Sequence, residues 1–106
     1  MKPLLRSTLL LCSWLLAGPG SAATDVAALR IQALAATCAN CHGSNGHPVD
    51  SSALPGLAGV PAAYLAEQLQ AFKAGSRPAT VMHQISRGYS DAQIQTLAAY
   101  FAAQPR

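Results

Sequence analysis

Apolar residues recur at intervals of three and four positions in three stretches of this chain, which is the spacing of one face of an α-helix. The first predicted helix runs over about residues 25–39, and Thr24 or Asp25 can cap its start. It leads directly into a pair of cysteines. The repeating positions that would form its apolar face are Val26, Leu29, Ala33 and Ala36.

Two more helices are predicted in the second half. One runs over about 61–74, because Pro61 suits the first helical position and Gly75 suits the residue after the end. Its shared apolar face consists of Leu65, Leu69 and Phe72. The other runs over about 91–103 and begins with a capping box, in which Ser90 and Gln93 satisfy each other's backbone amides. Its predicted buried stripe is Ile94, Leu97, Ala98 and Phe101.

The segments between these helices read as loops. Residues 43–60 are rich in Gly, Pro, Ser and Asn, and in residues 76–89 Pro78 and Gly88 argue against a continuous helix. Neither segment alternates apolar and polar residues over a useful length. The pattern therefore predicts an all-α domain whose three main helices and loops wrap around a central group.

The N-terminal residues 1–23 have the pattern of a cleaved secretory signal peptide. Lys2 and Arg6 precede an apolar stretch that contains Cys12 and Trp14, and small residues follow at 21–23. A retained membrane anchor is the alternative, but the apolar stretch is short against the roughly 20 residues of a spanning helix. We expect cleavage after Ala23, export to the periplasm, and no membrane span in the mature chain of residues 24–106.

Removal of the leader changes the charge balance. The whole chain has a formal net charge of +3, and loss of two basic residues leaves it near +1. There is no basic run, so nucleic-acid binding has no support. The mature chain makes one small domain, and domains of this size often need a staple such as disulfides or a metal.

Such a staple is encoded by Cys38-Ala39-Asn40-Cys41-His42, which is C-x-x-C-H, the attachment signature of a c-type haem. Two thiols three positions apart can form thioethers with the two vinyl groups of the porphyrin. The imidazole that follows can then bind the iron as its proximal ligand. The motif occurs once, so we predict one covalent haem c, held by Cys38 and Cys41, with His42 as an axial ligand.

Other interpretations of the motif require features that the sequence does not supply. A thioredoxin-like pair needs a βαβ context, which is not predicted around this motif. A structural zinc site needs four ligands: Cys38 and Cys41 would be two and His47 could be a third, but no convincing fourth follows. Cys12 would leave with the leader. A plain disulfide would leave His42 without a role.

The opposite face of the iron needs its own ligand. Met82 is the single methionine after the predicted cleavage site, and a Met–His pair gives a relatively high potential. We expect Met82 in the loop before the last helix, as the second axial ligand. Its rivals are His83 and His47, and the alternative role for Met82 itself is a core filler.

With these helices, the C-x-x-C-H motif and the later methionine, the chain resembles a class I c-type cytochrome. Residues 55–59, Pro-Gly-Leu-Ala-Gly, are similar to the P-x-L-x-G stretch of that family. The resemblance implies that the Pro55 carbonyl accepts from the ring N–H of His42 and that Leu57 lines the haem pocket. It also implies that Tyr100 and Phe101 pack the last helix against the first.

A closer resemblance covers the second half. Residues 64–72, 80–82, 88–91 and 97–101 are similar to the cytochrome subunit of flavocytochrome c sulfide dehydrogenase, and related dihaem bacterial cytochromes share much of this pattern. The single haem motif departs from the dihaem members. The resemblance implies a non-catalytic electron-transfer subunit, whose redox partner protein is a flavin-containing subunit that oxidises sulfide.

Two other functions stay open. One is a free, diffusible carrier for an oxidase or reductase, and the other is a haem ligand sensor or peroxidase-like enzyme, for which His83 would be the acid–base group. Two hypotheses concern single side chains. Tyr64 and Arg77 could bind a haem propionate, or simply be exposed. Lys73 and Arg87 could border the docking face, or simply be solvated.

Overall fold

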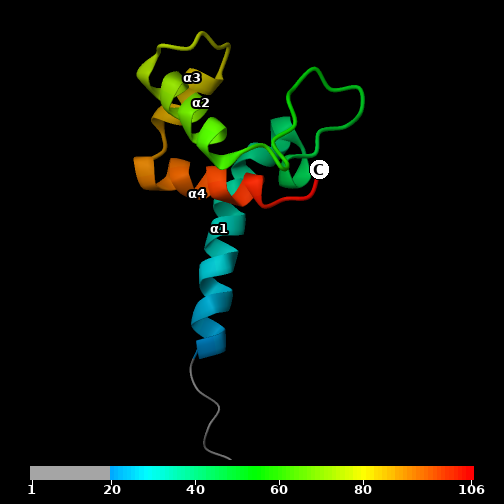
Figure 1. The fold of residues 1–106 in the computed structure, drawn as a ribbon, viewed down its shortest axis with the longest axis vertical. Helices are drawn as coiled ribbons and strands as arrows, with labels where there is room; N and C mark the ends of the chain where they lie inside the picture. Colours follow the sequence, from blue (N-terminus) through cyan, green and yellow to red (C-terminus); the bar gives the residue numbers. More distant parts are fainter. Residues whose placement is uncertain (1–19) are drawn as a thin grey trace, which may run out of the picture.

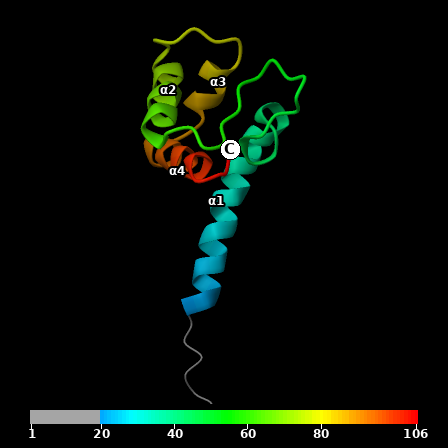
Figure 2. The same ribbon diagram turned by 45° about the vertical axis from the view of Figure 1, so that its right-hand side comes forward.

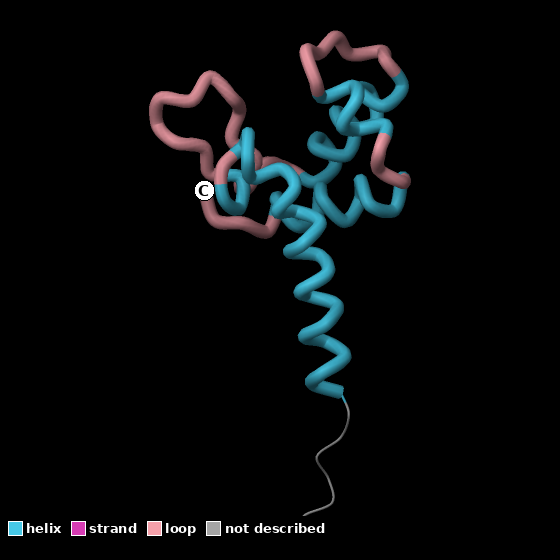
Figure 3. The backbone as a smooth tube through the Cα atoms, turned by 180° about the vertical axis from the view of Figure 1, so that it is seen from behind, coloured by secondary structure: helices cyan, strands magenta, loops and turns pink. Residues whose placement is uncertain are grey.

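The computed structural model describes the backbone of residues 20–106 and the side chains of residues 24–106. It contains four α-helices: α1 (Gly20–His42), α2 (Ala62–Ala74), α3 (Met82–Arg87) and α4 (Asp91–Ala102). A short 3-10 helix, η1 (Ser44–Gly46), follows α1. The described residues contain no strand, so the predicted all-α class is confirmed (Figure 3). Within the same residues, no helix combines the length and hydropathy that a membrane span requires.

The predicted signal peptide lies mostly outside the described residues, as do Cys12 and Trp14. Helix α1 is continuous from Gly20 through the expected cleavage position at Ala23. Cleavage after Ala23 stays a prediction, and it would leave Thr24 as the first residue of the helix.

Helix α1 corrects the predicted first helix in two ways. It continues through both cysteines to His42, and its many alanines have the highest helix propensity of any residue. The expected apolar face is also wrong, because Val26 and Leu29 are 47% and 61% exposed. The N-terminal half of α1 projects away from the other helices, so only its C-terminal half has neighbours to pack against (Figure 1).

The other two long helices confirm their predictions closely. Pro61 is the N-cap of α2, one position before the first helical residue where it was expected, and Gly75 ends that helix in the left-handed conformation with φ 78°. The capping box of α4 is present, since the Gln93 amide donates to Ser90 Oγ at 3.1 Å and the Ser90 amide donates to Gln93 Oε1 at 2.9 Å. The predicted stripe of α4 is buried at all four positions: Ile94, Leu97, Ala98 and Phe101.

The buried core lies where α4 crosses the C-terminal half of α1 and the base of α2. It consists of Ala35 from α1, Leu65 and Ala66 from α2, and the four stripe residues of α4. Helix α4 packs against both α1 and α2, whereas α3 packs against α2. Figure 2 shows α2 and α3 side by side above α4, with the loop that follows η1 on the other side of the molecule.

Candidate functional site

A cavity of about 230 Å³ opens above the core. Its lining comes from the end of α1, from the loop at residues 54–60, from α2 and α3, and from the buried face of α4. All four residues predicted to hold the haem are among those that line it: Cys38, Cys41, His42 and Met82. The chain therefore brings together residues that are up to forty-four positions apart in sequence.

The cysteines stand one turn apart near the end of α1. Residues three positions apart share a helix face, so both thiols reach the cavity together. Cys38 and Cys41 are free thiols, the first half-buried and the second exposed. Burial raises the pKa of the Cys38 thiol, and the nearby hydroxyls of Thr37 and Tyr89 partly oppose that rise.

The imidazole of His42 is fixed in a defined orientation. The side chain is 8% exposed, and its Nδ1–H donates a 2.8 Å hydrogen bond to the carbonyl oxygen of Pro55. The proton on Nδ1 leaves the lone pair of Nε2 free, which is the electron pair that a metal-binding imidazole uses. The contact between Pro55 and His42 that the resemblance implied is present.

The loop that carries Pro55 is held by backbone hydrogen bonds. The carbonyl oxygen of Gly46 accepts from the amide nitrogens of Leu57 at 2.9 Å and Ala58 at 3.3 Å. Gly46 has φ 81°, and an added Cβ would lie 2.8 Å from the Ala58 nitrogen. We call residues 37–60, from the end of α1 to Val60, the histidine wall of the cavity. Leu57 lines the cavity from this wall, as expected.

The opposite side of the cavity is the methionine wall, which we define as residues 62–89: α2, α3 and the turns that follow each. Met82 is the first residue of α3 and is half-buried. The expectation of a loop at this position is wrong, because residues 82–87 form a helix. The signals that could have found α3 are Val81 and Ile85, four positions apart, and Gly88 after the last helical residue.

The rival histidines do not line the cavity. His47 lies on an exposed loop, where its Nε2–H donates to the carbonyl oxygen of Pro105 at 2.8 Å. His83 is next to Met82 in α3 and is half-buried, and its Nδ1 is buried. Within residues 20–106, no three side chains of His, Cys, Asp or Glu gather as a metal site would require.

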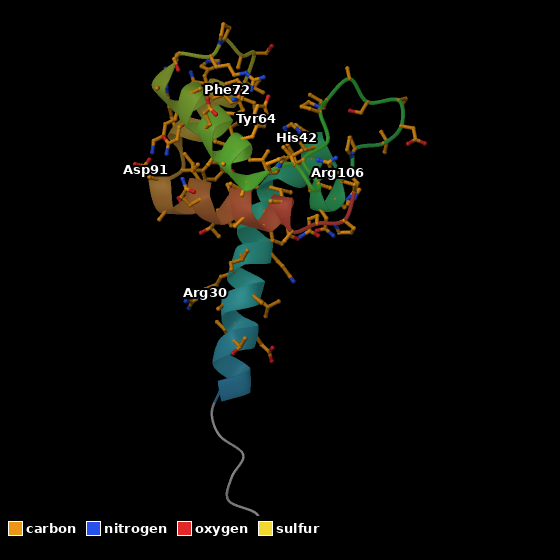
Figure 4. All side chains as sticks on the ribbon, viewed as in Figure 1. Arg30, His42, Tyr64, Phe72, Asp91 and Arg106 are labelled. Carbon is orange, nitrogen blue, oxygen red and sulfur yellow. The ribbon has the colours of Figure 1, made fainter. Side chains whose placement is uncertain are left out.

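Two side chains proposed for a propionate lie at the cavity. Tyr64 is half-exposed, and Arg77 stacks over the ring of Phe72 with 4.6 Å between its guanidinium carbon and the ring centre. Arg77 also donates a hydrogen bond to Gln68. Figure 4 shows Tyr64 and Phe72 on α2, facing the side of the molecule where His42 lies. The propionate role stays a hypothesis.

Lys73 is engaged inside the domain. Its Nζ donates to Asp91 Oδ1 and to the carbonyl oxygen of Tyr89, both at 2.8 Å. Together with a hydrogen bond from Gln70, it lowers the pKa of the Asp91 carboxyl. The interpretation of Lys73 as a merely solvated cation is therefore wrong, whereas Arg87 is exposed at the end of α3.

Tyr100 and Phe101 connect α4 to the histidine wall. The Phe101 ring is 4% exposed and stands edge-on to Tyr100, with 5.2 Å between ring centres. The Tyr100 hydroxyl donates to Asn45 Oδ1 at 2.7 Å, and the Phe101 carbonyl accepts from the Gly59 amide at 2.9 Å. These contacts hold the loop after α1 against the last helix.

The donor set fits a c-type haem. Two thiols, an imidazole with a free Nε2 and a thioether surround one cavity whose other lining is mostly apolar. An apolar wall excludes water, and a large flat ring can be packed there without leaving polar groups unpaired.

Comparisons with known proteins agree with this geometry. The profile of the family described as "Cytochrome c" matches residues 28–104. The chain is 37% identical over 86 residues to the cytochrome subunit of sulfide dehydrogenase of Chlorobaculum tepidum. The matched region covers 79% of this chain and 76% of that protein.

Two other relatives have different names. The chain is 41% identical over 68 residues to a thiosulfate dehydrogenase electron acceptor of Thiomonas intermedia, covering 64% of this chain and 31% of that protein. It is 39% identical over 104 residues to cytochrome c4 of Pseudomonas aeruginosa, covering 98% of this chain and 49% of that protein. The chain thus spans about a third and a half of the lengths of these two relatives.

Proposed function

This chain belongs to the cytochrome c family, and from that premise we propose that it is an exported electron carrier with one covalent haem that receives electrons from a sulfide-oxidising flavoprotein. Membership of the family makes it an electron carrier and implies covalent haem c. The number of haems, their ligands, the export and the partner are the parts that we propose here.

The observation that carries the ligand assignment is the single cavity lined by Cys38, Cys41, His42 and Met82. In the proposed holoprotein, the thiols of Cys38 and Cys41 would add across the two vinyl groups of the haem to give thioethers, and His42 Nε2 and the Met82 sulfur would bind the iron. The haem supplies a metal that takes up one electron and returns it. The protein holds His42 in place through Pro55, and its apolar lining excludes water from the ring.

Fixed ligands favour rapid electron transfer, because little has to move when the charge changes. The His42 ring cannot turn without breaking its 2.8 Å bond to the Pro55 carbonyl oxygen. A neutral thioether and an apolar surround disfavour the extra positive charge of the ferric state, which raises the potential. The residues around the cavity therefore suit a carrier rather than an enzyme with an open iron.

The ligand assignment is tested by Met82→Ala, with His83→Ala as the matched control at the next position. Met82→Ala should lower the reduction potential by on the order of 0.1–0.3 V, within the roughly 0.8 V span of haem proteins, and open the ferrous iron to carbon monoxide. His83→Ala should change neither property. If Met82→Ala still excludes carbon monoxide while His83→Ala admits it, His83 is the ligand instead.

The flavoprotein partner is supported by the match to the sulfide dehydrogenase cytochrome subunit, which covers most of both chains. Oxidation of sulfide to sulfur releases two electrons, so a one-electron carrier must serve the flavin twice for each sulfide. A free carrier is the second candidate, because the comparable identity to cytochrome c4 along almost the whole chain means that similarity does not single out the sulfide dehydrogenase subunit.

Size-exclusion chromatography of the protein from its native source, with full visible spectra across the peak, separates the two candidates. Flavin absorbance that co-elutes with the haem band at the size of a heterodimer supports the subunit. A haem band alone at the monomer size supports the free carrier and rules out a stable flavoprotein complex.

A further inference from the structure

The hydroxyl oxygens of Thr37 and Tyr89 lie 2.7 Å apart and form a hydrogen bond, although fifty-two positions separate the two residues in sequence. Thr37 lies on α1 directly before Cys38, and Tyr89 follows α3 in the turn that leads to α4. Both residues line the cavity. The contact therefore joins the histidine wall to the methionine wall.

The direction of this hydrogen bond follows from the proton count. Thr37 Oγ1 carries one proton, and it donates that proton to the Leu34 carbonyl oxygen at 2.7 Å. Oγ1 then has only lone pairs for a second partner, so Tyr89 is the donor. The threonine is held by its own helix, and the tyrosine reaches across to it.

Tyr89 is also fixed through its backbone. Its carbonyl oxygen accepts from Lys73 Nζ at 2.8 Å, and its amide donates to the Ser86 carbonyl oxygen at 3.2 Å. Its ring packs against the buried core. Tyr89 thus has bonds to α1, α2 and α3 at once, seven positions after Met82.

Other contacts leave this junction between the walls comparatively open. Helix α1 packs mainly against η1 and α4, whereas α3 packs mainly against α2. Val81 and Ile85 line the cavity together with Met82. The segment that carries Met82 is therefore placed against the cavity and α2, and the Tyr89–Thr37 hydrogen bond is a direct connection from the end of this segment to α1.

We propose that the Tyr89–Thr37 hydrogen bond is a clasp that keeps the methionine wall closed, and that Tyr89 is a positioning residue for the bond between Met82 and the iron. This inference rests on the proposed ligation by Met82. Tyr89 acts through the wall it holds: when the clasp opens, α3 can move outward, and the Met82 sulfur leaves the iron more readily.

The test is the affinity of the ferric holoprotein for imidazole, a small ligand that must displace the Met82 sulfur. Tyr89→Phe keeps the ring and removes only the hydroxyl. A hydrogen bond between neutral groups makes a modest net contribution, so the variant should bind imidazole about 2- to 10-fold more tightly, as followed by the visible spectrum.

The chain offers a matched control in Tyr100→Phe. Tyr100 also donates a 2.7 Å hydrogen bond across a long sequence separation, to Asn45, but it joins α4 to the histidine wall and leaves the methionine wall alone. Its loss should lower the midpoint of thermal unfolding without changing the imidazole affinity. If the two variants change the imidazole affinity equally, the Tyr89–Thr37 hydrogen bond only stabilises the fold in general, and the proposed positioning role of Tyr89 is wrong.

Thr37→Val removes the other end of the clasp. It should increase the imidazole affinity as Tyr89→Phe does, and the double variant should add little, because both changes remove one interaction. Fully additive effects would overturn the proposal, since they would mean that the two hydroxyls act independently.

Met82→Ala separates failure of the clasp from failure of the ligation. If Met82→Ala binds imidazole much more tightly than wild type and Tyr89→Phe does not, the clasp is wrong and the ligation stands. If Met82→Ala itself leaves the affinity unchanged, the assignment of Met82 is wrong, and the clasp falls with it.

Discussion

The two walls of the cavity are built by different kinds of interaction. The histidine wall is held in large part by backbone groups: the Gly46 carbonyl accepts from two amides of the facing loop, and Pro55 presents its carbonyl to His42. The methionine wall is held largely by side chains, with Lys73 bridging Tyr89 and Asp91, and Tyr89 reaching Thr37. One proposed ligand is thus set in a rigid frame, and the other is set in a frame that single side-chain changes can loosen.

This difference would suit the proposed haem with two unlike ligands. The fixed imidazole of His42 would stay bound in both oxidation states, because its ring is oriented independently of the metal. The bond from the Met82 thioether could be tuned, since the wall behind it depends on a few exposed or half-exposed contacts. We expect substitutions in the histidine wall to change stability most, and substitutions in the methionine wall to change ligand exchange most.

The largest expected effect comes from Gly46→Ala. The left-handed φ of 81° costs an L-residue about 1–2 kcal/mol, and the new Cβ would meet Ala58, Leu57 and Phe101 at 2.8–3.0 Å, for a total of about 2–5 kcal/mol. Urea unfolding of the holoprotein measures the loss.

Gly75→Ala, in the methionine wall, is its matched control. Gly75 has a similar φ of 78°, but a Cβ there would have nothing within 4 Å. The cost should be about 1–2 kcal/mol, from the backbone conformation alone. Equal losses for the two variants would contradict the view that the histidine wall is the more tightly packed.

A smaller effect is expected from Ser90→Ala, directly after Tyr89. The change removes one half of the capping box of α4 and should cost about 1 kcal/mol of unfolding free energy. Because Ser90 joins the methionine wall to α4, imidazole binding should also increase slightly. A loss of stability with no change in imidazole affinity would mean that the end of this wall moves independently of Met82.

The smallest effect is a pH dependence at Asp91. Hydrogen bonds from Lys73 and Gln70 lower the pKa of this exposed carboxyl below its ordinary value of 3.8, so the ionised form favours the folded state. That contribution is present above the ordinary pKa and is lost as the pH falls through the lowered one. Asp91→Asn should therefore be less stable than wild type at pH 7, and the difference should begin to shrink below about pH 3.8 and vanish once the pH has passed below the lowered pKa. A thermal-unfolding difference that persists at low pH would contradict this account.

The sequence predicted best where local chemistry decides the structure. Ser90 and Gln93 form the expected cap, Gly75 ends α2 in the left-handed conformation, and α4 buries its predicted stripe. The motif at 38–42 also predicted which side chains would gather at the cavity. In each case the determining groups lie within a few positions of one another.

Prediction failed where long-range contacts decide. Val26 and Leu29 have helical spacing, but both are exposed. The prediction of a buried face was wrong because spacing alone cannot tell whether another element covers that face. Helix α3 is six residues long, which is too short to establish a periodic pattern. The bond between Tyr89 and Thr37 joins positions that only the folded chain brings together, so no local signal points to it.

The last residues of the chain have a consequence for the order in which the molecule forms. His47 donates to the Pro105 carbonyl oxygen, and Arg106 Nε donates to the Gly59 carbonyl oxygen at 3.1 Å. The loop beside His42 is therefore completed by residues that are synthesised well after it. Chain synthesis produces the thiols of Cys38 and Cys41 before this part of their enclosure can close, so the two thiols are accessible on an open chain during that interval.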